Sequence, residues 1–96
     1  MLAAIDIEKK LNELKPLIQK KFFVKRIGYF GSFATGDQTE NSDIDVLVEF
    51  SQPLGWEFFD LSDLLEKELE RKIDLVSIKA LKPQLRDDIL SQVRYV

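Results

Sequence analysis

The sequence contains no cysteine and no histidine among its 96 residues. Without cysteine the chain can form neither a disulfide nor a thiolate nucleophile, and it offers no zinc–thiolate site. Without histidine it lacks the side chain that most often acts as a base near neutral pH. Any chemistry must therefore use Asp, Glu, Ser, Lys and Arg, and any metal must be a hard cation such as Mg²⁺ or Mn²⁺ held by oxygen ligands.

Long apolar runs and an excess of positive charge are also missing. No stretch approaches the roughly 18 apolar residues of a membrane span, and the first residues show no signal-peptide pattern, so we expect a cytoplasmic protein. The net charge of −3 argues against a protein that works by coating nucleic acid, which needs a basic face. The chain is 45% hydrophobic and 32% charged. This composition and length predict one globular domain over residues 1–96.

The hydrophobic pattern predicts alternating helices and strands. Apolar residues at helical spacing predict a helix over Ala4–Phe22, in which Pro16 should produce a kink or a break into two short helices. β-Branched and aromatic residues predict strands over Val24–Phe30, Ile44–Phe50 and Ile73–Ser77. A second long helix is expected over residues 57–72, and a further helix should begin at Pro83. This order indicates an α/β fold with a small mixed β-sheet packed against helices.

Two groups of residues could serve either the fold or a partner. Four cations lie at the end of the first predicted helix and just after it: Lys20, Lys21, Lys25 and Arg26. We interpret them as a solvated helix end, because cations suit the negative end of the helix dipole. The aromatic residues Trp56, Phe58 and Phe59 begin the second predicted helix. Their helical spacing favours a place in the core, with an exposed docking surface as the alternative.

Gly31 and Ser32 directly follow the first predicted strand, where the chain must turn sharply. Exposed backbone N–H groups at such a turn can bind an anion, and the serine hydroxyl adds a further donor. Glycine also lets a phosphate approach the backbone closely. An ordinary turn between two strands is the other interpretation of this pair.

Three aspartates are the candidate ligands and catalytic groups. Asp43 and Asp45 stand at the start of a predicted strand and would share one face of it, so a divalent cation would relieve their repulsion. Alternatively, Asp43 caps the strand and Asp45 faces water. Asp74 lies within the apolar run of the third strand, where an unpaired buried charge is expensive. It either faces solvent on an edge strand or lies beside the other two, sharing the cation and taking a proton from an acceptor hydroxyl.

The motif formed by these residues resembles that of a known superfamily. Gly31-Ser32, ten intervening residues and then Asp43 and Asp45 resemble the Gly-Ser-x10-Asp-x-Asp signature of nucleotidyltransferases related to DNA polymerase β. The small size, the strand with Asp74 and the pattern of the final segment resemble its minimal nucleotidyltransferase (MNT) branch. The resemblance implies that Asp43, Asp45 and Asp74 are catalytic and bind two Mg²⁺ ions. It also implies that Gly31 and Ser32 contact the phosphates of ATP.

The resemblance further implies a reaction and a partner. Members of the minimal branch act beside HEPN ribonuclease toxins as antitoxins, and some transfer AMP from ATP to a tyrosine of the toxin. We therefore expect a protein adenylyltransferase in a hetero-oligomer with such a toxin, without direct binding to nucleic acid or membranes. The alternatives are an antitoxin that neutralises by binding alone, a nucleotidyltransferase that acts on small molecules with another subunit, and an α/β domain without a metal site.

The chain departs from the family in the segment after Gly-Ser. Many members carry arginine there, whereas this chain has Phe33 and Thr35. The sequence therefore leaves open how the charge of the triphosphate would be neutralised. Lys79, Lys82 and Arg86 are candidates, although a solvated surface is the simpler role for each.

Overall fold

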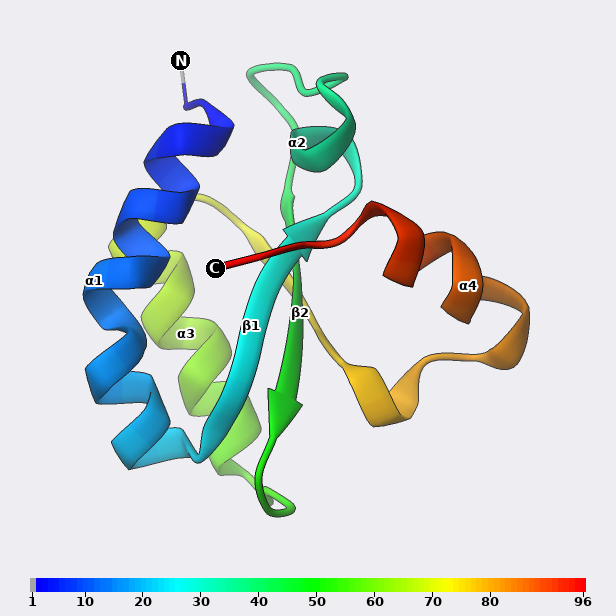
Figure 1. Ribbon diagram of the computed structural model, residues 1–96. Coiled ribbons are helices and arrows are strands. Elements are labelled where there is room, and N and C mark those ends of the chain that lie inside the picture. The colour runs from blue at the N-terminus through cyan, green and yellow to red at the C-terminus, as the bar shows by residue number, and fades with distance from the viewer. Residues whose placement is uncertain (1) are drawn as a thin grey trace.

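The computed structural model describes residues 2–96 and builds them around a four-stranded mixed sheet (Figure 1). The strand order is β3-β2-β1-β4. The central strand β1 (Val24–Phe30) is antiparallel to β2 (Ile44–Phe50) and to β4 (Arg94–Tyr95). By contrast, β2 runs parallel to β3 (Ile73–Ser77). The α/β class and the small mixed sheet predicted from the sequence are confirmed.

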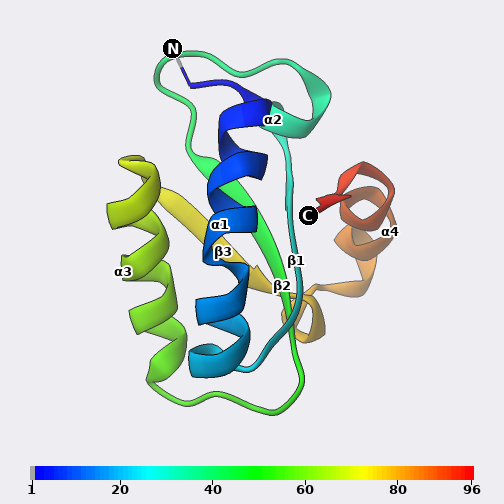
Figure 2. The same cartoon turned by 60° about the vertical axis from the view of Figure 1, so that its left-hand side comes forward.

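Two long helices, α1 (Ala4–Phe22) and α3 (Glu57–Leu69), cover one face of this sheet (Figure 2). Their apolar stripes pack against the inward-facing residues of β1, β2 and β3 to form the main core. The buried residues of α3 are Leu61, Leu65 and Leu69. Trp56 and Phe59 lie off this stripe and are 83% and 58% exposed, so the core interpretation is wrong for these two.

The helix α1 continues through Pro16 as one element, so the expected break into two short helices is wrong, while the expected kink stays a prediction. Proline removes one backbone donor and crowds the preceding turn. Because Pro16 is exposed, water can satisfy the carbonyl that loses its partner. The buried stripe of α1 consists of Ile7, Leu11, Leu14, Ile18 and Phe22. These residues hold both halves of the helix on the sheet, so packing outweighs the local cost of the proline.

The helix α4 (Pro83–Gln92) lies on the opposite side of the sheet, at a distance from the strands (Figure 1). The side chains of α4 are all exposed or half-buried. Ile89 and Leu90 reach a small second core around Leu47, whereas Leu85 is 49% exposed. This face is therefore thinly covered, in contrast to the face under α1 and α3.

Several short elements complete the chain. α2 (Ser32–Thr35) is a single turn after β1, and the 3-10 turn η1 (Ile78–Ala80) follows β3. The helix α3 ends at Leu69, three residues before the predicted end, because Glu70 adopts a left-handed conformation with φ of 51°. None of the helices formed by residues 2–96 combines the length and apolarity that a bilayer span requires.

Candidate active site

Asp45 and Asp74 are direct neighbours in adjacent strands. The register pairs Asp45 of β2 with Asp74 of β3, and on its other side it pairs Asp45 with Phe30, the last residue of β1. Paired residues of neighbouring strands point to the same face of a sheet. Asp45 shares this face with Leu47, which packs below α4. Asp74 therefore lies on the same side of the sheet as Asp45, as a shared site requires.

The electrostatics of Asp45 reflect its acidic neighbours. The side chain is half-buried, and its pKa is raised to about 6, first because burial penalises the charged carboxylate. The negative charges of Asp74 and Asp43 raise this pKa further, as does a hydrogen bond with the Asp74 carboxyl. A cation between these groups would favour the ionised form and lower the pKa.

Asp43 is less closely integrated than the other two aspartates. It lies one residue before β2, and its side chain is exposed. Within residues 2–96, no three acidic side chains are arranged as a complete set of metal ligands. The structure thus brings Asp45 and Asp74 together and leaves Asp43 at the rim. A pair of repelling carboxylates, with no nitrogen or sulfur donor beside it, suits Mg²⁺. In proteins this ion usually keeps several water ligands, and the phosphates of a substrate complete its coordination shell.

Gly31 faces the carboxyl group of Asp45. Its φ of 71° lies in the left-handed region, and a Cβ added there would overlap the Oδ2 atom of Asp45. Glycine is therefore required both by conformation and by space. The Gly31 N–H donates to Oε1 of Gln92 in α4 at 3.4 Å. Ser32 then opens α2, and first-turn N–H groups of a helix have no acceptor within the helix. The predicted phosphate-contacting pair thus lies beside the predicted metal ligands.

Arg71 is a cation at this end of the sheet that sequence reasoning did not single out. Its Nη1 donates to the backbone oxygen of Ser42 at 2.8 Å, next to Asp43. Its guanidinium carbon lies 5.9 Å from the ring centroid of Phe33 in α2. Arg71 therefore connects the two segments that carry the candidate residues. The signal available in the sequence was an arginine three positions before Asp74.

The three cations considered from the sequence lie on other elements. Lys79 is part of η1, beyond the end of β3 that is remote from Asp74, and lines a separate pocket. Arg86 Nη1 lies 3.5 Å from the carbonyl oxygen of Ile78, and Lys82 is the N-cap residue of α4. Of the cations discussed, Arg71 contacts the segments around the carboxylates, through Ser42 and Phe33.

Comparison with known proteins identifies the family. The model of the nucleotidyltransferase domain matches residues 5–96. The chain is 37% identical to the protein adenylyltransferase MntA of Thermococcus cleftensis, and the match covers 100% of this chain and 98% of that protein.

Solved structures share the fold. One, described as a candidate minimal nucleotidyltransferase, matches with a TM-score of 0.83 and 28% identity over 97% of this chain and 95% of its own. Another, a toxin–antitoxin complex with AMP-PNP, matches with a TM-score of 0.70 and 27% identity over 98% of this chain and 72% of its own. The family model and these relatives agree with the resemblance seen in the Gly-Ser and Asp-x-Asp motif. This chain belongs to the nucleotidyltransferase domain family, in its minimal nucleotidyltransferase branch.

Proposed function

We propose that this chain is a Mg²⁺-dependent protein adenylyltransferase that transfers AMP from ATP to a tyrosine hydroxyl of a partner HEPN toxin, and so acts as its antitoxin. We further propose that residues 1–96 act as one domain in the cytoplasm. The observation that carries the proposal is the placement of Asp45 beside both Asp74 and Gly31. The adenylyltransferase relative and the toxin–antitoxin complex with AMP-PNP support the choice of nucleotide and partner.

The carboxylates of Asp43, Asp45 and Asp74 would hold the Mg²⁺ ions. When bound, Mg²⁺ neutralises charge on the phosphates and stabilises both the attacking and the leaving oxygen. Such a reaction needs positioning and electrostatic stabilisation more than covalent help from the protein. A chain without histidine and cysteine can therefore perform it.

The remaining steps belong to side chains and backbone of this chain. Ser32 offers its N–H and hydroxyl donors to the phosphates, Gly31 lets them approach the backbone closely, and Arg71 adds a positive charge nearby. Asp74 accepts the proton of the acceptor hydroxyl. The acceptor oxygen then attacks the α-phosphorus of ATP, the bond to the pyrophosphate oxygen breaks, and AMP remains on the acceptor.

The decisive experiment measures the mass of the partner toxin after incubation with this chain, ATP and Mg²⁺. We expect a gain of one or more AMP units that disappears when either ATP or Mg²⁺ is omitted. The double variant D43N/D45N should abolish the gain while still forming the complex. The variant K67M, which changes an exposed residue of α3, should act like the wild type. An unchanged toxin mass with the wild-type chain, although the two proteins bind, would contradict catalysis.

One observation favours a second candidate, neutralisation by binding alone. Trp56 and Phe59 are strongly exposed rather than buried, so a surface suited to a protein partner exists away from the carboxylates. If the D43N/D45N variant neutralises the toxin as well as the wild type does, binding accounts for the antitoxin effect. Loss of neutralisation together with AMP transfer would assign the effect to catalysis.

A further inference from the structure

Four aromatic rings form a continuous ladder at the end of the sheet opposite the carboxylates. The ring centroids of Phe50 and Phe58 are 6.2 Å apart, those of Phe58 and Phe59 are 5.7 Å apart, and those of Phe59 and Trp56 are 5.8 Å apart. The ladder runs from half-buried Phe50 and Phe58 to Trp56, which is 83% exposed. Large exposed aromatic residues that are contiguous in this way are typical of protein-binding sites.

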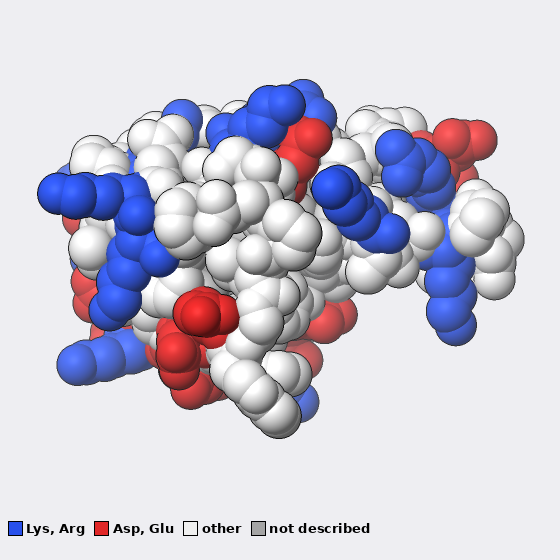
Figure 3. All heavy atoms as spheres, turned by 90° about the horizontal axis from the view of Figure 1, so that it is seen from below, with Lys and Arg blue, Asp and Glu red and all other residues white. Residues whose placement is uncertain are grey.

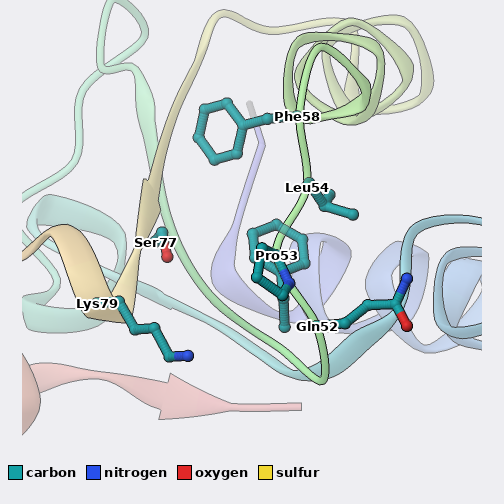
Figure 4. A pocket seen from close by; sticks show the side chains of 7 residues that line it. Gln52, Pro53, Leu54, Phe58, Ser77 and Lys79 are labelled. Atoms are coloured by element: carbon teal, nitrogen blue, oxygen red, sulfur yellow. The ribbon is translucent and has the colours of Figure 1, made fainter.

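A pocket of about 240 Å³ opens beside this ladder. Phe58, Pro53 and Leu54 line it from the α3 side, while Ser77 and Lys79 face it from the β3 side (Figure 4). This volume is below the roughly 300–1,000 Å³ of pockets that bind drug-sized molecules. Its mostly apolar wall offers few groups that could form hydrogen bonds or ion pairs with a polar ligand. It therefore suits an apolar side chain of a peptide better than a free metabolite.

Cations gather on the β3 side of the pocket, whereas Glu57 and Asp60 lie in the first turn of α3 on its other side. Figure 3 shows this end of the molecule, where Lys and Arg lie on several sides of a white surface and acidic residues lie between and beside them. Lys20 and Lys21 form the last turn of α1, and Lys79 lines the pocket. Arg26 is already paired with Glu49 at 2.8 Å. The pKa of Glu49 is lowered first by Arg26 and then also by Lys25 and Lys79, so these cations converge on one region.

We propose that this end of the molecule docks an acidic segment of a partner protein that inserts an apolar side chain between Phe58, Pro53 and Lys79. The lysines would attract the acidic residues of the segment, and the aromatic ladder would cover its apolar side. A nucleic acid fits less well, because the pocket is lined mainly by apolar groups and a sugar-phosphate backbone offers no apolar side chain to fill it. The basic residues Lys20 and Lys21 at the end of α1 thus gain a role beyond stabilising the helix end.

The surface is independent of the proposed catalysis. Phe50 lies five residues from Asp45 along β2, which is about 17 Å in an extended strand. A partner could therefore be held here without covering the carboxylates. Failure of the docking proposal would leave AMP transfer untouched, and failure of AMP transfer would leave the docking surface untouched.

Trp56 provides the measurement, because it is the single tryptophan of the chain. The probes are synthetic 15-residue peptides in which one or two Leu or Phe anchors, at varied spacing, are flanked by Glu and Asp. Matched sets carry Lys or Ser in place of the acids, and a 12-nucleotide uridine RNA tests the alternative polyanion. We expect members of the acidic set alone to shift the Trp56 emission to shorter wavelength, with affinity that falls as salt rises.

Variants test whether the change in Trp56 emission comes from binding at this surface. The change F59S should weaken binding of the acidic peptides by about tenfold or more, and K20E/K21E should slow association and reduce the salt dependence. L85S removes another exposed apolar residue, on α4, and should change nothing. Far-ultraviolet circular dichroism checks that each variant is folded. The proposal is overturned if no acidic peptide shifts the emission, if the Lys peptides or the RNA shift it as strongly, or if F59S binds like the wild type.

Discussion

Asp45 of β2 and Asp74 of β3 occupy paired positions in two parallel strands, with Gly31 directly against the Asp45 carboxyl. This packing places like charges side by side in a half-buried position, and the pKa of Asp45 rises to about 6 as a result of burial and of both acidic neighbours. An arrangement that is unfavourable for the protein alone becomes favourable when a cation binds. The same contacts therefore predict both a metal site and a pH-dependent loss of stability.

Replacing Asp45 by Asn should stabilise the metal-free protein above pH 6 and have little effect at pH 4. The folded-state pKa of about 6 exceeds the unfolded value of about 3.9, so the folded chain binds the proton more tightly. Stability is therefore lost as pH rises from about 4 to about 6 and stays low above that. Because Asp45 is half-buried, solvent screening limits the gain to about 1 kcal/mol.

Urea unfolding in EDTA at pH 4 and pH 8 measures this difference. Added Mg²⁺ should raise the unfolding midpoint of the wild type at pH 8 and leave that of D45N nearly unchanged. The exposed Asp60 of α3 supplies the control for the Mg²⁺ response, because D60N should leave that response unchanged. Equal effects of D45N at both pH values would show that Asp45 is not repelled by its neighbours.

Alanine substitutions at two glycines separate backbone strain from damage to the site. Both Gly31 and Gly36 have positive φ, so either substitution should cost about 1 kcal/mol of unfolding free energy. A Cβ at Gly36 meets nothing within 4 Å, whereas a Cβ at Gly31 overlaps the Asp45 carboxyl. We expect G31A to abolish AMP transfer and Mg²⁺-dependent stabilisation, and G36A to retain both. Activity in G31A close to that of G36A would mean that Asp45 need not stay where the structure places it.

The sheet was predictable because its strands are short apolar runs with clear ends. The predicted bounds of β1, β2 and β3 coincide with those of the structure. The strand β4 was missed because its two residues, Arg94 and Tyr95, carry no strand pattern. Its pairing depends on space at Gly28, where an added Cβ would lie 2.6 Å from the oxygen of Arg94. Such room is a property of the packed chain and not of the local sequence.

The residues of the candidate site could be predicted from the sequence, but their arrangement in space could not. The spacing of Gly31, Ser32, Asp43 and Asp45 identified the family, and the structure places Asp74 next to Asp45 by strand register. The unequal exposure of Asp43 and Asp45 depends on where β2 begins, which alternation alone does not fix. Arg71 escaped notice because its hydrogen bond to Ser42 spans 29 positions in the chain. The roles of these residues in catalysis remain predictions.

Replacing Arg71 by Met should reduce AMP transfer by about tenfold. The change removes a charge-assisted hydrogen bond to the Ser42 carbonyl and the contact with the Phe33 ring, so the loops around Asp43 lose a common support. R71K keeps a positive charge without the planar fork and should fall between wild type and R71M. Titration of ATP binding with a fluorescent analogue separates weaker nucleotide binding from slower transfer. K67M on α3 is the control, and an R71M enzyme with wild-type kinetics would exclude Arg71 from the site.

Because α1 continues through Pro16, we expect the free energy of unfolding to rise when this proline is replaced, without any effect on the candidate site. P16A restores a backbone donor inside the helix and removes the clash of the ring with the preceding turn, a gain of about 3 kcal/mol in helix propensity. Alanine gives the unfolded chain more conformational freedom than proline does, and this reduces the gain in unfolding free energy by about 1 kcal/mol. The net gain of about 2 kcal/mol should raise the melting temperature by about 10 °C in a chain of this size.

Differential scanning calorimetry of P16A and of a neighbouring control tests this balance. L17A changes an exposed residue of the same helix and should shift the melting temperature by far less. Because Pro16 faces solvent, the restored hydrogen bond needs no repacking of the buried stripe. A melting temperature of P16A equal to or below that of the wild type would mean that α1 already bends at Pro16. In that case the kink expected from the proline would be confirmed.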